Sequence, residues 1–411
     1  APHSCSLSIP SAFILLPEIS DPIPEVGCGQ SPQKAIIMMP YLSCKKIEND
    51  VYNFPTWQYC KYKDIFDSRI IINSTAKFYI SISYQKDLLS IDTRIFTPST
   101  FLDNIEKTHG LYSPPALGLA AAIACCGFTF LLGGGPIEMF CAFVGAGIGN
   151  YLRCKLTKHH FTLFLCIVSS VSLACFAYAG LLKLGEILFG ISVQHEAGYI
   201  CAMLFIIPGF PFITSGIDLA KLDMRSGIER LTYALIVILV ATMSAWIMAL
   251  ILHLKPVDFI KLSLSTEQWI LFRLLASFCG VFGFSIMFNS PVRLAVAAAG
   301  IGAVANTLRL ELVDLANIPP AAAAFIGALT AGLLASLLKN KVGYPRISVT
   351  VPSIVIMVPG LYLYRGFYNL GIMSLSVAAS WFASAILIIA ALPLGLIFAR
   401  ILTDKAFRYC T

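Results

Sequence analysis

Charged side chains are scarce in this sequence of 411 residues. Only 12% of the residues are Asp, Glu, Lys or Arg, against roughly 25% in soluble globular domains. This scarcity excludes a soluble globular fold for most of the chain. The formal net charge of +7 does not indicate nucleic-acid binding, because the basic residues cluster between long apolar segments, as in membrane proteins.

Recognisable catalytic and nucleotide-binding motifs are missing as well. The sequence has no Walker loop, no nucleophile elbow and no Cys or His spacing typical of zinc. We therefore expect no enzyme activity, no cofactor and no metal site. Most of the thirteen cysteines sit in apolar runs, where a thiol acts as a small hydrophobic side chain. Four near the start are compatible with disulfides or with free thiols: Cys5, Cys28, Cys44 and Cys60.

Apolar segments make up most of the sequence. Hydrophobic residues account for 57% of it, and the mean hydropathy is +0.80. Runs long enough to cross about 30 Å of hydrocarbon follow one another from residue 115. We predict about ten transmembrane helices, at 115–133, 136–152, 161–182, 197–216, 229–252, 267–287, 291–308, 318–338, 347–365 and 374–401. The chain is therefore predicted to be an α-helical integral membrane protein embedded in the lipid bilayer.

The first 113 residues differ from the rest and are predicted to form a small α+β domain. Apolar and polar residues alternate on both sides of a turn, which predicts a β-hairpin at about 77–96. Thr100 followed by Asp103 indicates the start of a short helix at about 100–108. The remaining parts are two membrane units, 114–254 and 266–402, and a tail, 403–411.

Positive charge is divided unevenly between the predicted loops. If the N-terminal domain is cytoplasmic, the loops and tail on that side hold thirteen Lys and Arg residues, and the opposite loops hold five. Cytoplasmic loops of membrane proteins carry the excess of these residues. We therefore expect a multi-pass protein of the inner (plasma) membrane with both termini in the cytoplasm.

Two of the predicted helices are interrupted by a Pro-Gly pair. The pairs are Pro208 with Gly209 in "IIPGFPF" and Pro359 with Gly360 in "MVPGLYLY", and they lie 151 positions apart. Proline removes a backbone donor and glycine loosens a helix, and both are costly in lipid unless the freed groups find partners. Two such breaks indicate a site rather than two accidental kinks.

Other residues repeat along with the breaks. The same offset sets Asp218 on Asn369, and Asn150 in "GIGNYLR" matches Asn306 in "GAVANTLR". The membrane part is therefore predicted to be two copies of a five-helix unit. Because five is odd, the second copy must enter the membrane from the opposite side, which gives an inverted repeat. Many secondary transporters have this architecture.

In such folds the ends of broken helices contact substrate near the middle of the membrane. The candidate substrate-binding or pathway residues are Pro208, Gly209, Ser215, Asp218, Asn150, Asn306, Pro359, Gly360, Arg365 and Asn369. Asp218 and Glu138 are the candidates for coupling to protons. The two asparagines have an alternative role as hydrogen bonds between helices.

The charged candidates also have alternative interpretations in which they play no part in transport. Asp218 is equally compatible with a cytoplasmic helix-end acid paired with Lys221 or Arg225, and Glu138 with an exposed loop acid. Arg273 lies inside a predicted span, where an arginine needs a partner, an aqueous cavity or a path to the headgroups.

Three segments resemble the threonine/serine exporter family over about residues 115–402. They are "LLGGGPIEMFCAFVGAGIGNYLR", "IIPGFPFITSGIDLAKLDMRSGIERL" and "MVPGLYLYRGFYNLG". The resemblance implies a cytoplasmic N-terminal domain, ten spans and export of small amino acids driven by the proton gradient. Both family halves are fused here, whereas some relatives divide them between two proteins, and one such pair resembles a dicarboxylate exporter.

We therefore predict a secondary transporter that exports threonine or serine, with protons as the coupling ion. A dicarboxylate exporter is the alternative, with a second anion site formed by Arg365 and either Arg273 or Arg293. A channel is less favoured, because a channel needs rings of like residues along an open pore. A membrane scaffold gives no reason for two matched breaks.

Overall fold

A computed structural model describes residues 110–190, 193–256, 258–259, 262–342, 345–404 and 407. These residues belong to one compact unit, 110–411. The predicted β-hairpin at 77–96 and helix at 100–108 lie outside the described residues, as does most of the 403–411 tail.

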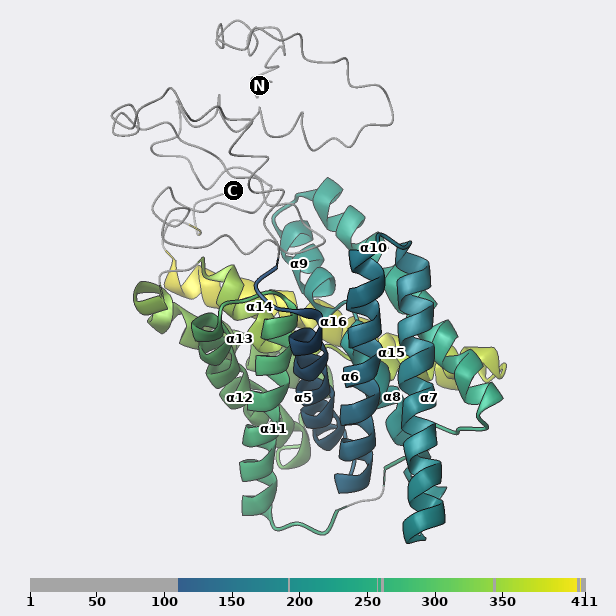
Figure 1. The fold of residues 1–411 in the computed structure, drawn as a ribbon. Helices are drawn as coiled ribbons and strands as arrows, with labels where there is room; N and C mark the ends of the chain where they lie inside the picture. The colour runs from purple at the N-terminus through teal and green to yellow at the C-terminus, as the bar shows by residue number, and fades with distance from the viewer. Residues whose placement is uncertain are drawn as a thin grey trace, which may run out of the picture. The chain divides into compact units, whose positions relative to one another are not determined.

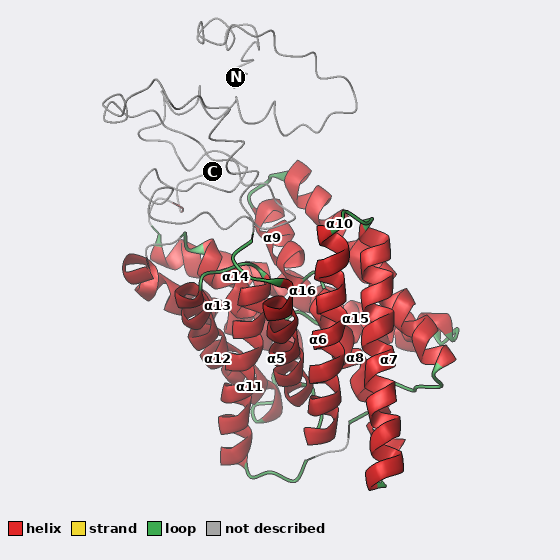
Figure 2. Cartoon of the chain, in the orientation of Figure 1, coloured by secondary structure: helices red, strands yellow, loops and turns green. Residues whose placement is uncertain are grey.

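Helices form nearly all of the described chain, and no strand occurs in it (Figure 2). The first half holds α5 (Pro114–Leu131), α6 (Pro136–Lys158), α7 (Leu163–Phe189), η2 (Val193–Gly198), α8 (Tyr199–Met203), η3 (Leu204–Ile206), α9 (Gly209–Ala220) and α10 (Met224–Ile251). The second half holds α11 (Thr266–Met287), α12 (Val292–Asp314), α13 (Pro320–Val342), α14 (Ile347–Val355), α15 (Gly360–Gly371) and α16 (Leu375–Thr403).

Seven of the described helices are long and apolar enough to cross a membrane, and two bent helix pairs raise the number to as many as nine. The chain is thus a helical, multi-pass membrane protein. The predicted number of ten is one too high by this criterion, because α6 is not among the candidates. α6 does form a helix of 23 residues at the predicted place, but it carries charge at both ends, from Glu138 to Lys158.

Local sequence explains where the helices begin and end. Pro136 occupies the first turn of α6, where its missing N–H has no helical partner to lose. At the start of α11 the Ser265 hydroxyl accepts a hydrogen bond from the Gln268 N–H at 3.3 Å, and the Gln268 side chain accepts one from the Ser265 N–H at 3.0 Å. Gly190 ends α7 in the left-handed conformation at φ 64°.

Both Pro-Gly pairs break a helix, as predicted, and they break it in the same way. The chain bends by 55° between His195–Ile206 and Gly209–Ala220, and by 49° between Ile347–Val355 and Gly360–Gly371. The φ and ψ angles are −80° and 57° at Pro208, and −81° and 58° at Pro359.

The first helices of the two halves, α5 and α11, lie side by side and run in opposite directions (Figure 1). A Cβ on Gly127 would lie 2.5 Å from the Ala276 carbonyl oxygen, and one on Gly283 would lie 2.4 Å from that of Ala120. The ring centroids of Phe128 and Phe284 are 6.3 Å apart. Glycine at the crossing lets the two backbones approach closely, which is the usual basis of helix association in lipid.

Candidate functional site

The two helix breaks lie against each other. A Cβ on Gly209 would lie 3.1 Å from Val355 Cγ1, just before the second break, and one on Gly360 would lie 3.1 Å from Leu204 Cδ2, just before the first. The small cavity between them, about 10 Å³, is lined by Phe128, Leu204, Ile207, Gly209, Phe284, Val355, Val358 and Gly360. This space is apolar and large enough for about one water molecule. The residues at the two helix breaks therefore pack directly against each other.

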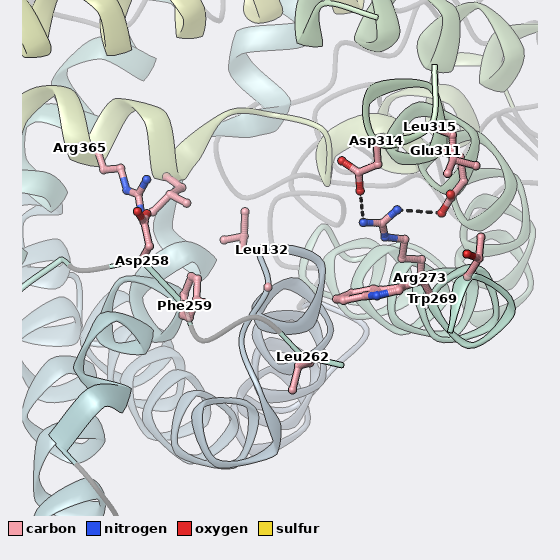
Figure 3. A pocket seen from close by; sticks show the side chains of 13 residues that line it. Leu132, Asp258, Phe259, Leu262, Trp269, Arg273, Glu311, Asp314, Leu315 and Arg365 are labelled. Atoms are coloured by element: carbon pink, nitrogen blue, oxygen red, sulfur yellow. Dashed lines mark hydrogen bonds and ion pairs between the residues drawn. The ribbon is translucent and has the colours of Figure 1, made fainter. Parts of the chain in front are cut away.

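A much larger pocket of about 530 Å³ lies beyond the second break. Its lining residues are Leu132, Gly133, Asp258, Phe259, Leu262, Thr266, Trp269, Arg273, Glu311, Asp314, Leu315, Leu361 and Arg365 (Figure 3). We call this pocket the vestibule. It reaches Leu361, and the neighbouring residue Gly360 lines the small cavity. The vestibule thus leads to the closed contact between the breaks.

Arg273 lies on one side of the vestibule, and both of its Nη atoms have acidic partners (Figure 3). Its Nη1 is 2.8 Å from Glu311 Oε1, and its Nη2 contacts Asp314 of the same helix, α12. The guanidinium also lies 4.9 Å from the centre of the Trp269 ring, a cation–π contact. Of the possibilities open for an arginine inside a span, the structure shows acidic partners at the edge of a pocket.

Arg365 lies on the opposite side of the vestibule (Figure 3). Its Nη2 donates a hydrogen bond to Asp258 Oδ1 at 2.7 Å, and its guanidinium lies 5.0 Å from the centre of the Trp381 ring. The Asp258 side chain is 88% exposed, so this ion pair is weak and easily exchanged. It joins α15 to the connection between α10 and α11.

Asp218 lies in α9, nine residues beyond the first break, and is buried. Its Oδ2 is 3.4 Å from Arg230 Nη1 of α10. The sequence predicted Lys221 or Arg225 as the alternative partner. Lys221 does lie near Asp218, and the ion pair is made with Arg230, because α10 folds back along α9. The buried carboxylate therefore faces two basic side chains, Arg230 and Lys221.

Basic residues gather near Asp218, where the α9–α10 turn, the start of α14 and the end of α16 approach one another. Burial and then the nearby Arg400 lower the pKa of Lys221, which follows α9. The same two causes lower the pKa of Arg346, which precedes α14. Arg346 donates hydrogen bonds to Thr403 at 2.7 Å and to the Gly332 carbonyl oxygen. Basic side chains from three parts of the chain thus gather on this face of the protein, together with Asp218, Asp223 and Asp404.

Glu138 is not an exposed loop acid. It is 1% exposed, in the first turn of α6, and accepts a hydrogen bond from the Gly135 N–H at 2.9 Å. Its other oxygen lies 2.7 Å from His195 Nδ1. The sequence reasoning missed His195, because a histidine 57 positions away carries no pattern that would identify it as a partner.

Two tyrosines that the sequence analysis also missed join the halves. The hydroxyls of Tyr199 on α8 and Tyr364 on α15 are 2.7 Å apart, and both side chains are buried. Each tyrosine belongs to one of the two bent helix pairs. This hydrogen bond therefore ties one broken helix to the other.

The remaining predicted site residues do not gather at the breaks. Asn150 donates to the Leu117 carbonyl oxygen of α5 at 2.8 Å, and Asn306 donates to the Ser277 hydroxyl of α11 at 2.9 Å. These contacts match the predicted alternative role of hydrogen bonds between helices. Ser215 bonds within its own helix, to Phe212. Asn369 likewise donates to the Arg365 carbonyl oxygen at 2.8 Å.

The fold and site define a class, that of multi-pass helical membrane proteins in which two broken helices close below a charged vestibule. Two family models match the chain: "Putative threonine/serine exporter" over residues 80–252 and "Threonine/Serine exporter, ThrE" over residues 273–402. The chain belongs to the threonine/serine exporter family, with both halves fused, as predicted. Members of this family are transporters. No curated protein and no solved structure matches the chain.

Proposed function

We propose that this protein is a secondary transporter that exports threonine and serine across the inner membrane, driven by the proton gradient. The observation that carries the proposal is the contact between the two Pro-Gly breaks, next to the charged vestibule. Broken helices that meet within the membrane are the usual binding and gating elements of such transporters.

An inverted repeat would explain how the contact between the breaks opens and closes during transport. The antiparallel packing of α5 and α11 and the equal backbone angles of Pro208 and Pro359 support two five-helix units of opposite orientation. Rocking of one unit against the other would then separate the breaks on one side at a time. The vestibule would be the outer side and the face around Arg400 the cytoplasmic side, in agreement with the excess of inner positive charge.

The vestibule has the charges that a zwitterion requires. An amino acid presents one carboxylate and one ammonium group. The vestibule offers the Arg273 guanidinium beside the carboxylates of Glu311 and Asp314, and the Arg365 guanidinium beside Asp258 on the opposite side. The N-terminus of α15 at Gly360 adds a partial positive charge below them. Substrate leaving the contact between the breaks would meet both signs of charge.

Counterflow in liposomes tests the proposal. Liposomes that contain the purified full-length protein and unlabelled threonine should accumulate labelled threonine by exchange, and a proton gradient should drive release that an uncoupler abolishes. A channel would give no such accumulation, and a scaffold would give no flux at all. Empty liposomes are the control for leakage.

A dicarboxylate is the second candidate substrate, because two arginines line one vestibule. Succinate would use Arg273 and Arg365 together as two anion sites, after displacing their acidic partners. Exchange of labelled succinate but not threonine would reverse the assignment. Arg365→Gln separates the two cases, since it should weaken succinate exchange far more than threonine exchange.

A further inference from the structure

We propose that Glu138 and His195 form the site at which the driving proton enters from the vestibule side. The inference deepens the proposed function and rests on it. Glu138 has one oxygen on the Gly135 N–H and the other 2.7 Å from His195 Nδ1. A buried carboxylate hydrogen-bonded to an imidazole is an arrangement in which one proton can be held and passed between the two groups.

The pair lies between the vestibule and the protein interior. Gly133 lines the vestibule, and Gly135, two residues further along the same glycine turn, donates to Glu138. The Glu138 side chain is 1% exposed, whereas that of His195 is 15% exposed. The imidazole is therefore the more accessible partner of the pair. A proton can bind the imidazole from solution and neutralise the carboxylate without any movement of Glu138 into water.

Of the groups around Glu138, we assign the change of charge to His195. Cys141 of α6, Tyr178 of α7 and Cys201 of α8 lie around Glu138, and their thiol and phenol groups are neutral at physiological pH. Glu196, next to His195, accepts a hydrogen bond from the Lys255 N–H at 3.2 Å. With neutral His195 the pair has a charge of −1, and with one added proton it has none.

Uptake of the proton acts on a helix that closes the pathway. His195 is the first residue of the first bent helix pair, and its carbonyl oxygen accepts a hydrogen bond from the Tyr178 hydroxyl at 2.6 Å. The same segment continues through α8 and η3 to the break at Pro208. Loss of the buried negative charge thus changes how tightly this segment is held to α6.

The second half has no equivalent of this site. Pro136 corresponds to Pro291, so the position of Glu138 is occupied by Arg293, and the offset of the breaks sets His195 on Arg346. Arginine does not lose its proton in proteins. In an inverted repeat the two positions face opposite sides of the membrane. The proton site is therefore present on the vestibule side alone.

The test measures labelled threonine and internal pH together in liposomes that contain the full-length protein. Glu138→Gln keeps the acceptor for the Gly135 N–H but cannot ionise. We expect E138Q to move at least about tenfold fewer protons for each threonine transported than the wild type. His195→Asn removes the ionisable side chain and should flatten the dependence of driven export on external pH.

Matched controls are Glu186→Gln and His159→Asn, which make the same changes at exposed positions. If E138Q cannot be recovered as a monodisperse protein, the pH profile of H195N decides, because that side chain is partly exposed. Unchanged proton flux in E138Q, or an unchanged pH profile in H195N, overturns the proposal. Threonine exchange without proton flux in the wild type also overturns it and leaves the exporter intact, whereas absence of any threonine exchange defeats the proposed function itself.

Discussion

Among single residues, Asp218 gives the most direct test of coupling on the cytoplasmic side. Asp218→Asn removes the charge that faces Arg230 at 3.4 Å and should abolish gradient-driven export of threonine while sparing exchange, because exchange needs no net proton movement. The measurement is labelled threonine flux in liposomes with and without a proton gradient. Glu229→Gln, an exposed neighbour of Arg230, is the control. Driven export at the wild-type rate in D218N would leave Asp218 a purely structural partner of Arg230.

The Tyr199–Tyr364 hydrogen bond gives a prediction about stability. Changing either tyrosine to Phe leaves the other hydroxyl buried without its partner and should lower the free energy of unfolding by about 1–3 kcal/mol. The double variant should lose less than the sum of the two, since no orphaned hydroxyl remains. Thermal unfolding in detergent measures all three variants, with Tyr151→Phe as a partly exposed control. Strictly additive losses would contradict a direct contact between the two hydroxyls.

Among the helices, the crossing of α5 and α11 has little tolerance for added volume. Gly127→Ala would place a Cβ 2.5 Å from the Ala276 carbonyl oxygen, so the helices must separate, at a cost of about 1–3 kcal/mol of stability. Gly300→Ala, in α12, meets nothing within 4 Å and should be neutral or stabilising by up to about 1 kcal/mol. Thermal unfolding compares them, and equal effects would rule out a close crossing.

The sequence alone predicted the positions of the helices well, but it predicted poorly which side chains contact one another between helices. Proline and capping residues mark helix ends in any surroundings, so the starts of α6 and α11 follow from local chemistry, as do the two breaks. Contacts between helices have no such local signal. Glu138 therefore looked exposed until the fold placed His195 against it, and Asp218 was assigned neighbours in sequence, although its partner comes from the following helix.

For the whole molecule, the main prediction is which side of the membrane each end of the helices faces. Asp258 lines the vestibule with its side chain 88% exposed, so a cysteine there should react with a membrane-impermeant thiol reagent in intact cells. A cysteine in place of Lys341 should react only after the membrane is opened, because the excess of positive charge places that loop inside. The unsubstituted chain gives the background from native cysteines. Labelling at position 341 in intact cells would remove the argument for two inverted units.

The dry contact between the breaks has an electrical consequence. Protons cross proteins along chains of hydrogen-bonded water, and a cavity of about 10 Å³ with hydrocarbon walls has room for about one molecule. We therefore expect no proton conduction through the contact between the breaks in this conformation. A planar bilayer containing it should show no conductance above that of the bare lipid while substrate is absent. A cell could then carry many copies at rest without draining its ion gradients or spending respiration to restore them.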